Sequence, residues 1–150
     1  KAFNELLVLL APDLSSSYIE YYSGWSPEIP LESVMTIDWE KNLLYGQLKH
    51  GAHRMDVLMK SNGVEIKSIY SRGQKKMLAL ISYLSCLKVM DDHSQNQSIL
   101  CLDDFDAELD YHNTNHFFSY LNTLPNQILI STVESSLYNE KGVKVFHVEQ

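Results

Sequence analysis

Apolar residues recur along the chain with two different periods, and these periods predict its secondary structure. Between residues 77 and 90 they recur at three- and four-residue spacing, which predicts one long helix with a broad apolar face, followed by the polar loop DDHSQNQ (residues 91–97). The residues on this face are Met77, Leu78, Leu80, Ile81, Leu84, Leu87 and Met90. The predicted helix is long enough to be a major element of the core.

Short uninterrupted apolar runs follow the long helix. Residues 98–104 (SILCLDD), 126–132 (NQILIST) and 143–150 (VKVFHVEQ) predict three strands, of the kind that is buried on both faces of a parallel sheet. Residues 111–121 predict a helix between the first two strands, with Asp110 near its cap. A strand–helix–strand order predicts an α/β unit whose functional edge lies at the carboxyl ends of the strands.

The first seventy residues mix both periods. Residues 1–12 predict a short helix that Pro12 stops, and the alternating residues 15–24 predict a strand. A helical stretch is expected within residues 27–47. Residues 55–70 predict two strands around Asn62-Gly63, because an Asn-Gly pair readily takes the positive φ angles of a tight hairpin.

Composition and charge narrow the class of protein. The chain has 150 residues, 45% hydrophobic and 21% charged, which fits one globular domain with a real core. A net charge of −7 argues against broad, sequence-independent attraction to DNA or anionic lipid. No apolar run is long enough to cross a membrane, and no stretch resembles a signal peptide. Cys86 and Cys101 lie among apolar residues and predict reduced, buried thiols of a cytoplasmic protein.

The main candidate for chemistry is the segment ILCLDDFDAELD. Asp103 and Asp104 follow an apolar run where a strand should end. One carboxylate at such a tip can hold Mg²⁺, while its neighbour orients or deprotonates an attacking water. The alternative is an acidic turn with solvated carboxylates, which is the more frequent outcome for an isolated pair.

The acids that follow resemble a calcium loop only in part. Asp106, Glu108 and Asp110 have the alternating spacing of such a loop. However, Leu109 stands where the loop needs glycine and Asn115 where it needs a bidentate acid. Calcium binding is therefore not expected.

Histidines and Arg54 offer weaker candidates. His112 and His116 are four residues apart on a predicted helix, so they could share a face and bind zinc, but no glutamate lies between them. Exposed or capping histidines are the more frequent case. In HGAHRMD (residues 50–56), Arg54 could contact an anion or nucleic acid, or the segment could simply lead into a strand. The residues leave that choice open.

The start of the long helix, YSRGQKKM, combines features that can bind phosphate. Ser71 can cap the helix, and Gly73 permits close approach of backbone to a ligand. Free N–H groups at a helix start suit an anion, and Arg72, Lys75 and Lys76 add positive charge. A capped amphipathic helix would explain the segment if it stood alone. With a two-acid strand tip downstream, phosphate binding is the better interpretation.

Four segments in a fixed order carry a family resemblance. YYSGW (residues 21–25), HGAHRMDV (50–57), YSRGQKKM (70–77) and ILCLDDFDAELD (99–110) resemble segments of ABC-type ATPases of the SMC class, and within that class the RecF recombination-repair family. The resemblance is to the C-terminal half of these ATPases and covers most of the chain. Ala52 departs from the family, which usually has proline there.

The resemblance implies a role for the helix start and the strand tip. Ser71, Gly73 and Gln74 match the signature motif, which in a nucleotide-bound dimer contacts the γ-phosphate held by the other subunit, and Arg72 lies within that motif. For the acids of the Walker B strand, the family pattern implies that Asp103 associates with Mg²⁺. Asp104 takes the place of the catalytic acid.

The resemblance also implies roles near the later strand end. Asp110 matches the D-loop acid that communicates across the dimer. Ser131 and Thr132 end a strand where many ABC proteins carry a switch histidine, and Thr132 is a nucleotide-binding candidate. Without that histidine the γ-phosphate sensor is not assigned.

One expected motif is absent from the sequence. No GxxxxGK[ST] loop occurs: the only suitably spaced glycines, Gly46 and Gly51, are followed by Ala52 and His53. Since the chain also begins with Lys1, it is expected to be a C-terminal fragment of an α/β ABC-type ATPase head that lacks the Walker A lobe. Residues 1–12 would end the helical arm, and residues 13–150 would carry the signature, Walker B, D-loop and switch segments.

The functional hypothesis is a fragment of a RecF-like DNA-binding ATPase in recombinational repair and replication-fork maintenance. The resemblance implies ATP and Mg²⁺ as cofactors of the parent, an ATP-dependent homodimer, double-stranded or gapped DNA, and RecR/RecO-type mediators as partners. Without a phosphate-binding loop, the fragment alone should be inactive. Two alternatives remain: a non-catalytic interaction module, and a Mg²⁺-dependent nuclease that uses Asp103, Asp104 and Asp106.

Overall fold

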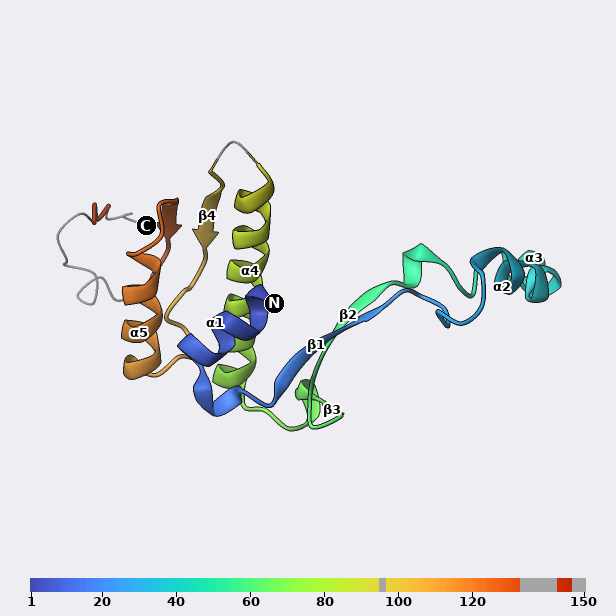
Figure 1. Ribbon diagram of the computed structural model, residues 1–150, viewed down its shortest axis with the longest axis horizontal. Coiled ribbons are helices and arrows are strands. Elements are labelled where there is room, and N and C mark those ends of the chain that lie inside the picture. The colour runs from blue at the N-terminus through green and yellow to red at the C-terminus, as the bar shows by residue number, and fades with distance from the viewer. Residues whose placement is uncertain (95–96, 133–142, 147–150) are drawn as a thin grey trace. The chain divides into compact units, whose positions relative to one another are not determined.

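A computed structural model describes residues 1–94, 97–132 and 143–146, and divides the chain into two compact units (Figure 1). The first unit comprises Lys1–Ser15 and Tyr70–Gln150, and the second comprises Ser16–Ile69. The predicted division between an arm (1–12) and a head (13–150) concerns the family's architecture and stays a prediction.

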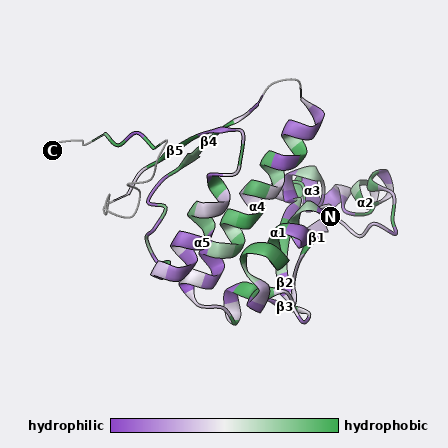
Figure 2. Ribbon diagram, turned by 60° about the vertical axis from the view of Figure 1, so that its left-hand side comes forward, coloured by the Kyte–Doolittle hydropathy of each residue, from purple (hydrophilic) through white to green (hydrophobic). Residues whose placement is uncertain are grey.

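Two helices form the centre of the first unit. Helix α1 (Ala2–Leu10) ends before Pro12, as predicted, and a short 3-10 helix, η1 (Pro12–Leu14), follows it. Helix α4 (Arg72–His93) packs against α1 (Figure 2). The buried residues of α1 are Phe3, Leu6, Leu7 and Leu10. At the margin of this contact, Lys88 Nζ of α4 lies 2.9 Å from Glu5 Oε2 of α1.

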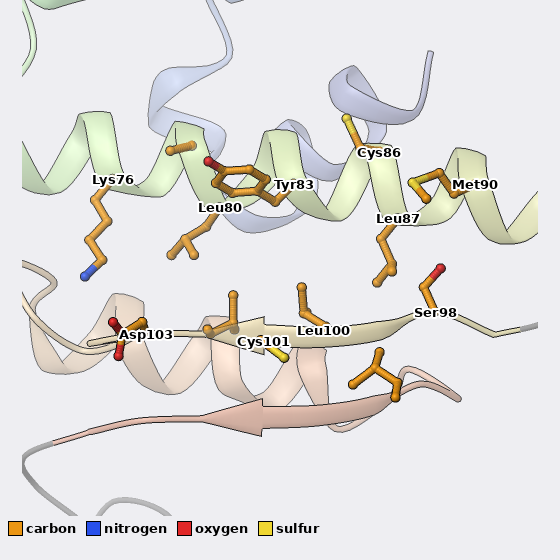
Figure 3. A pocket seen from close by; sticks show the side chains of 13 residues that line it. Lys76, Leu80, Tyr83, Cys86, Leu87, Met90, Ser98, Leu100, Cys101 and Asp103 are labelled. Atoms are coloured by element: carbon orange, nitrogen blue, oxygen red, sulfur yellow. The ribbon is translucent and has the colours of Figure 1, made fainter.

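The predicted apolar face of α4 is confirmed for six of its seven residues. Met77, Leu78, Leu80, Ile81, Leu84 and Leu87 are buried. Met90 is 60% exposed, so the prediction is wrong there. It lies near the end of the helix and lines an open groove between α4 and the strand β4 (Figure 3).

Two strands and a helix are the other main elements among the described residues of the first unit. Strand β4 (Ile99–Leu102) pairs with β5 (Gln127–Ile130) in parallel, with Leu102 opposite Ile130. Helix α5 (Tyr111–Leu121) connects them, which confirms the α/β unit. The rings of Phe105 and Phe117 are buried, and their centroids lie 5.7 Å apart. Their packing holds the turn after β4 against α5.

Burial of β4 on both faces was a wrong prediction. Leu100 and Leu102 are buried, but Ile99 and Cys101 between them are exposed. A two-stranded sheet therefore has one covered face within the described residues. The predicted burial of both thiols is wrong for the same reason at Cys101, and at Cys86 because it lies off the apolar face of α4.

The predicted third strand spans residues 143–150, of which 147–150 lie outside the described residues. Residues 143–146 are described and form no strand. Within the described part of the chain, no helix has the length and apolar character needed to cross a membrane.

The second unit is built on an antiparallel ribbon. Strands β1 (Ser17–Tyr22), β2 (Asp56–Ser61) and β3 (Val64–Glu65) form a three-stranded sheet in that order. Asn62 and Gly63 both have positive φ, 49° and 82°, which confirms the predicted hairpin. Short 3-10 helices η2 (Ala52–Arg54) and η3 (Ile66–Ser68) flank β2 and β3.

The predicted helical stretch of the second unit is divided into α2 (Leu31–Ile37) and α3 (Trp39–Tyr45). Asp38 separates them and is only 7% exposed. Its carboxylate lies 3.3 Å from His50 Nε2 and 3.5 Å from Lys49 Nζ. These contacts hold the segment after α3 against the junction of the two helices.

Two of the motifs that carry the family resemblance meet inside the second unit. The Gly51 N–H of HGAHRMDV donates to the Gly24 carbonyl of YYSGW over 3.4 Å. A Cβ on Gly24 would lie 2.1 Å from the Gly51 oxygen, and the φ of Gly24 is +95°. The motif YYSGW therefore needs glycine at residue 24 for this close backbone approach.

A polar cluster joins three elements at the other end of the first unit. The Asp91 carboxylate of α4 accepts hydrogen bonds from Asn126 Nδ2 (2.6 Å), Ser98 Oγ (2.8 Å) and the Ser98 N–H (3.0 Å). These residues lie at the end of α4 and just before β4 and β5. The bond from Asn126, and after it those from Ser98, lower the pKa of Asp91.

We expect Asp91→Asn to destabilise the chain at neutral pH, because the charged carboxylate is the form that the cluster stabilises. A lowered folded-state pKa gives stability that is present above the ordinary value of about 4 and is lost as pH falls through the lowered value. Urea unfolding at a series of pH values should show the difference from wild type shrinking toward acid. Asp92→Asn, a neighbouring exposed acid, is the control; equal effects would contradict the assignment.

Candidate functional site

The start of α4 is a capping box. Ser71 Oγ accepts the Gln74 N–H over 3.3 Å, and Gln74 Oε1 accepts the Ser71 N–H over 2.9 Å. The predicted cap at Ser71 is therefore confirmed. Both side chains are exposed, so the helix start is accessible as well as capped.

Gly73 lies against the turn that follows β4. A Cβ at this position would lie 2.7 Å from the backbone carbonyl oxygen of Glu108. Glu108 itself has φ 67°, in the left-handed region. Close approach of backbone at Gly73 was predicted for a ligand, whereas the described contact is with the chain's own carbonyl.

The basic residues of the first two turns have different environments. Arg72 is 86% exposed, and its Nη1 lies 3.9 Å from Glu108 Oε1, a long ion pair in water. Lys76 Nζ instead donates to the backbone carbonyl of Asp104. Lys76 therefore joins α4 to the tip of β4, while Arg72 remains accessible to a further anion.

The hydroxyl group of Ser131, the residue after β5, bonds to both aspartates at the tip of β4. Ser131 Oγ donates to Asp103 Oδ1 and accepts the Asp104 N–H over 2.9 Å. Asp104 has φ 46°, a left-handed conformation that aspartate tolerates better than most residues. Both carboxylates are exposed at the carboxyl end of the parallel pair, as predicted for a functional edge.

The donor set fits a magnesium ion that also binds phosphate. Mg²⁺ is commonly held by one or two carboxylates with substrate phosphates and water. Asp103 and Asp104 provide two exposed carboxylates at the strand tip. Within the described residues, no group of three or more His, Cys, Asp or Glu side chains could hold a metal ion alone. The trio predicted for a nuclease is therefore not assembled.

The remaining predicted residues stabilise the turn between β4 and α5. Thr132 Oγ1 donates to Asp106 Oδ2 over 2.6 Å, which fastens the end of β5 to this turn. Asp110 caps α5 by accepting the Asn113 N–H over 2.9 Å, as predicted. That backbone bond, and after it the Asn113 amide, lower the pKa of Asp110.

Arg54 lies in the second unit, exposed at the end of η2. Together with Gln47, Leu48 and His53 it lines a shallow pocket.

Two residues of the site were not assigned their role from the sequence. The Glu108 carbonyl contacts Gly73, and its carboxylate lies near Arg72. Lys76 bonds to the backbone oxygen of Asp104. No motif signals either contact, because both depend on how the turn after β4 folds back onto α4.

The described elements of the first unit form an α/β fold. Structures of the recombination mediator protein RecF, with ATP and with ATPrS, in the RecFOR pathway match 90% and 89% of the chain, each with a TM-score of 0.62 and 23% identity. They confirm the fold. The match is to the C-terminal part of RecF and covers 38% of each solved chain.

At the level of sequence, the chain is similar to RecF proteins. The DNA replication and repair proteins RecF of Francisella tularensis subsp. novicida (strain U112) and subsp. holarctica (strain LVS) are each 31% identical over 136 residues, 91% of this chain. The resemblance to RecF is thereby confirmed. The chain spans 39% of the length of these relatives. No protein-family model matches.

We expect Gly73→Ala to destabilise the first unit by about 1 to 3 kcal/mol, because the added methyl group meets a backbone atom that cannot rotate away. Urea unfolding monitored by circular dichroism measures the effect. Arg72→Ala, the adjacent exposed position, is the control and should change stability by less than about 0.5 kcal/mol. Equal stability of the Gly73→Ala chain and wild type would refute the contact with Glu108.

Proposed function

We propose that this chain supplies the signature helix start and the strand-tip acids of a RecF-type, ATP-dependent DNA-repair protein. The observation that carries the proposal is the joining of two motifs from distant parts of the sequence. Gly73 lies against Glu108, and Lys76 bonds to the Asp104 carbonyl. An exposed helix start and two exposed acids are thus held within one unit.

The helix start has the groups needed to bind a phosphate. The Ser71 hydroxyl accepts a bond from Gln74, so its own hydrogen remains available for donation. The N–H groups of Arg72 and Gly73 belong to the first turn, where the helix dipole favours negative charge. The exposed Arg72 guanidinium adds a charged donor. We infer that these groups bind the γ-phosphate of ATP held by a second subunit.

The strand tip is suited to the hydrolytic side of the reaction. Asp103, positioned by Ser131, would hold Mg²⁺, which neutralises charge on the phosphate oxygens when bound. Asp104 would orient the attacking water, and Asp110 would lie at the dimer contact. The Asp104 N–H donates to Ser131 Oγ and the Asp104 carbonyl accepts from Lys76 Nζ, so the backbone that carries this carboxylate is fixed on both sides.

The partners proposed for the whole protein follow from its relatives. The solved RecF structures describe a recombination mediator in the RecFOR pathway. We infer an ATP-dependent homodimer that acts on double-stranded or gapped DNA together with RecR/RecO-type mediators. With a net charge of −7, this chain would contribute locally rather than through broad attraction to DNA.

We expect Ser71→Asp to separate capping from phosphate binding. Aspartate is as good a cap as serine, so the helix should remain stable, but its charge would repel the γ-phosphate. The test uses a chimera in which this chain replaces the matching part of Francisella RecF, with ATP-dependent dimerisation measured by analytical ultracentrifugation. Ser71→Asp should lower dimer affinity at least about tenfold, the effect of roughly 1.4 kcal/mol.

Ser71→Thr is the matched control, because it keeps both the cap and the hydroxyl and should dimerise like the parent chimera. Asp104→Asn should leave dimerisation intact and slow ATP turnover about 10²-fold or more, as expected for loss of a group that positions water. If Ser71→Asp dimerised with ATP as well as Ser71→Thr, the phosphate role would be refuted and only the cap would remain.

A further inference from the structure

Two histidines outside the proposed site form an exposed pair on α5. His112 and His116 are four residues apart, one helical turn, and both are exposed. Their ring centroids lie 6.4 Å apart with the ring planes inclined by 44°. Nothing in the proposed ATPase role uses either side chain.

The nitrogens of this pair are available, unlike those of the other described histidines. His50 Nε2 lies 3.3 Å from the Asp38 carboxylate, His53 Nε2 bonds to the Leu48 carbonyl, and His93 Nδ1 bonds to the Val89 carbonyl. Within the described ranges, the His112 backbone N–H donates to the Asp110 carboxylate, but neither imidazole ring forms a hydrogen bond or ion pair. Both residues are exposed and their four-residue spacing places them on one side of the helix.

We propose that His112 and His116 chelate a divalent cation of borderline softness, such as Zn²⁺ or Cu²⁺. Histidine pairs at this helical spacing place two imidazoles on one face, where both can reach a single metal ion. A metal–nitrogen bond of about 2.0–2.1 Å places two cis imidazole centroids roughly 4.5–5 Å apart. Rotation about the side-chain torsions of two exposed residues closes the remaining gap from 6.4 Å.

The choice of metal follows from the ligand atoms. Imidazole nitrogen suits zinc and copper, whereas magnesium prefers carboxylate and phosphate oxygen. Asp103 and Asp104 provide oxygen ligands at the end of β4, and the histidine pair provides nitrogen ligands on α5. One unit of this protein would thus hold two sites with opposite metal preferences. Water would complete the coordination on the exposed helix.

Calorimetric titration of the whole chain with Zn²⁺, in excess Mg²⁺ to occupy oxygen sites, tests the proposal. We expect one Zn²⁺ per chain and a loss of affinity of about tenfold or more in both His112→Ala and His116→Ala, because each leaves a single imidazole. Alanine is the strongest helix former, so α5 should persist in both variants. His93→Ala and His147→Ala serve as controls and should bind like wild type.

A second measurement counts the ligands directly. Electron paramagnetic resonance of the Cu²⁺ complex should show two nitrogen ligands in wild type and one in each single variant. An unchanged affinity in either variant, or a loss of equal size in His93→Ala or His147→Ala, would overturn the chelate. ATP-dependent dimerisation of the chimera should be the same with both histidines replaced, so failure of this proposal is distinguishable from failure of the proposed function.

Discussion

The candidate site depends on a contact made by a residue without a side chain. Gly73 permits the Glu108 carbonyl oxygen to lie only 2.7 Å from the position that a Cβ would take. That approach brings the turn after β4 against the first turn of α4, and the bond from Lys76 to the Asp104 carbonyl secures it. Because of these two contacts, Ser71 and Arg72 share one surface region with the acidic turn. Without them, a capped helix and an acidic turn would be two unrelated features.

The same contact gives Gly73 two reasons to be glycine. One is internal, since a methyl group would collide with backbone. The other is the proposed one, since a bare backbone lets phosphate approach the helix start. Ser71 also has a double role, because its oxygen caps the helix while its hydrogen can be donated. A substitution to alanine at either position would mix these effects in an activity assay. Gly73→Ala is therefore used for stability alone, whereas Ser71→Asp keeps the cap and removes the hydroxyl.

Much of the fold could be predicted from the sequence because its signals are local. The cap at Ser71, the Asn62-Gly63 hairpin and the cap at Asp110 each depend on a few adjacent residues, and all are confirmed. Most of the errors concern burial: Met90, Cys86 and Cys101 are exposed, because exposure depends on which elements cover a face. The apolar run of β4 has the same sequence whether one face or both are covered. The contacts of Lys76 and Glu108 are likewise long-range and leave no local pattern. Similarity to RecF, by contrast, could be recognised because four motifs keep their order over the chain.

The central claim is that the Ser71 helix start acts on a nucleotide held by another subunit. Complementation between two inactive chimeras tests it most directly: one carries Ser71→Asp, and the other is altered in the phosphate-binding loop supplied by the Francisella RecF part. Each alone should fail to hydrolyse ATP at the normal rate. Mixed, they form one composite site with an intact loop from one subunit and an intact Ser71 from the other, so ATP turnover should return. If mixing two folded, associating variants restored no turnover, action across the dimer would be contradicted.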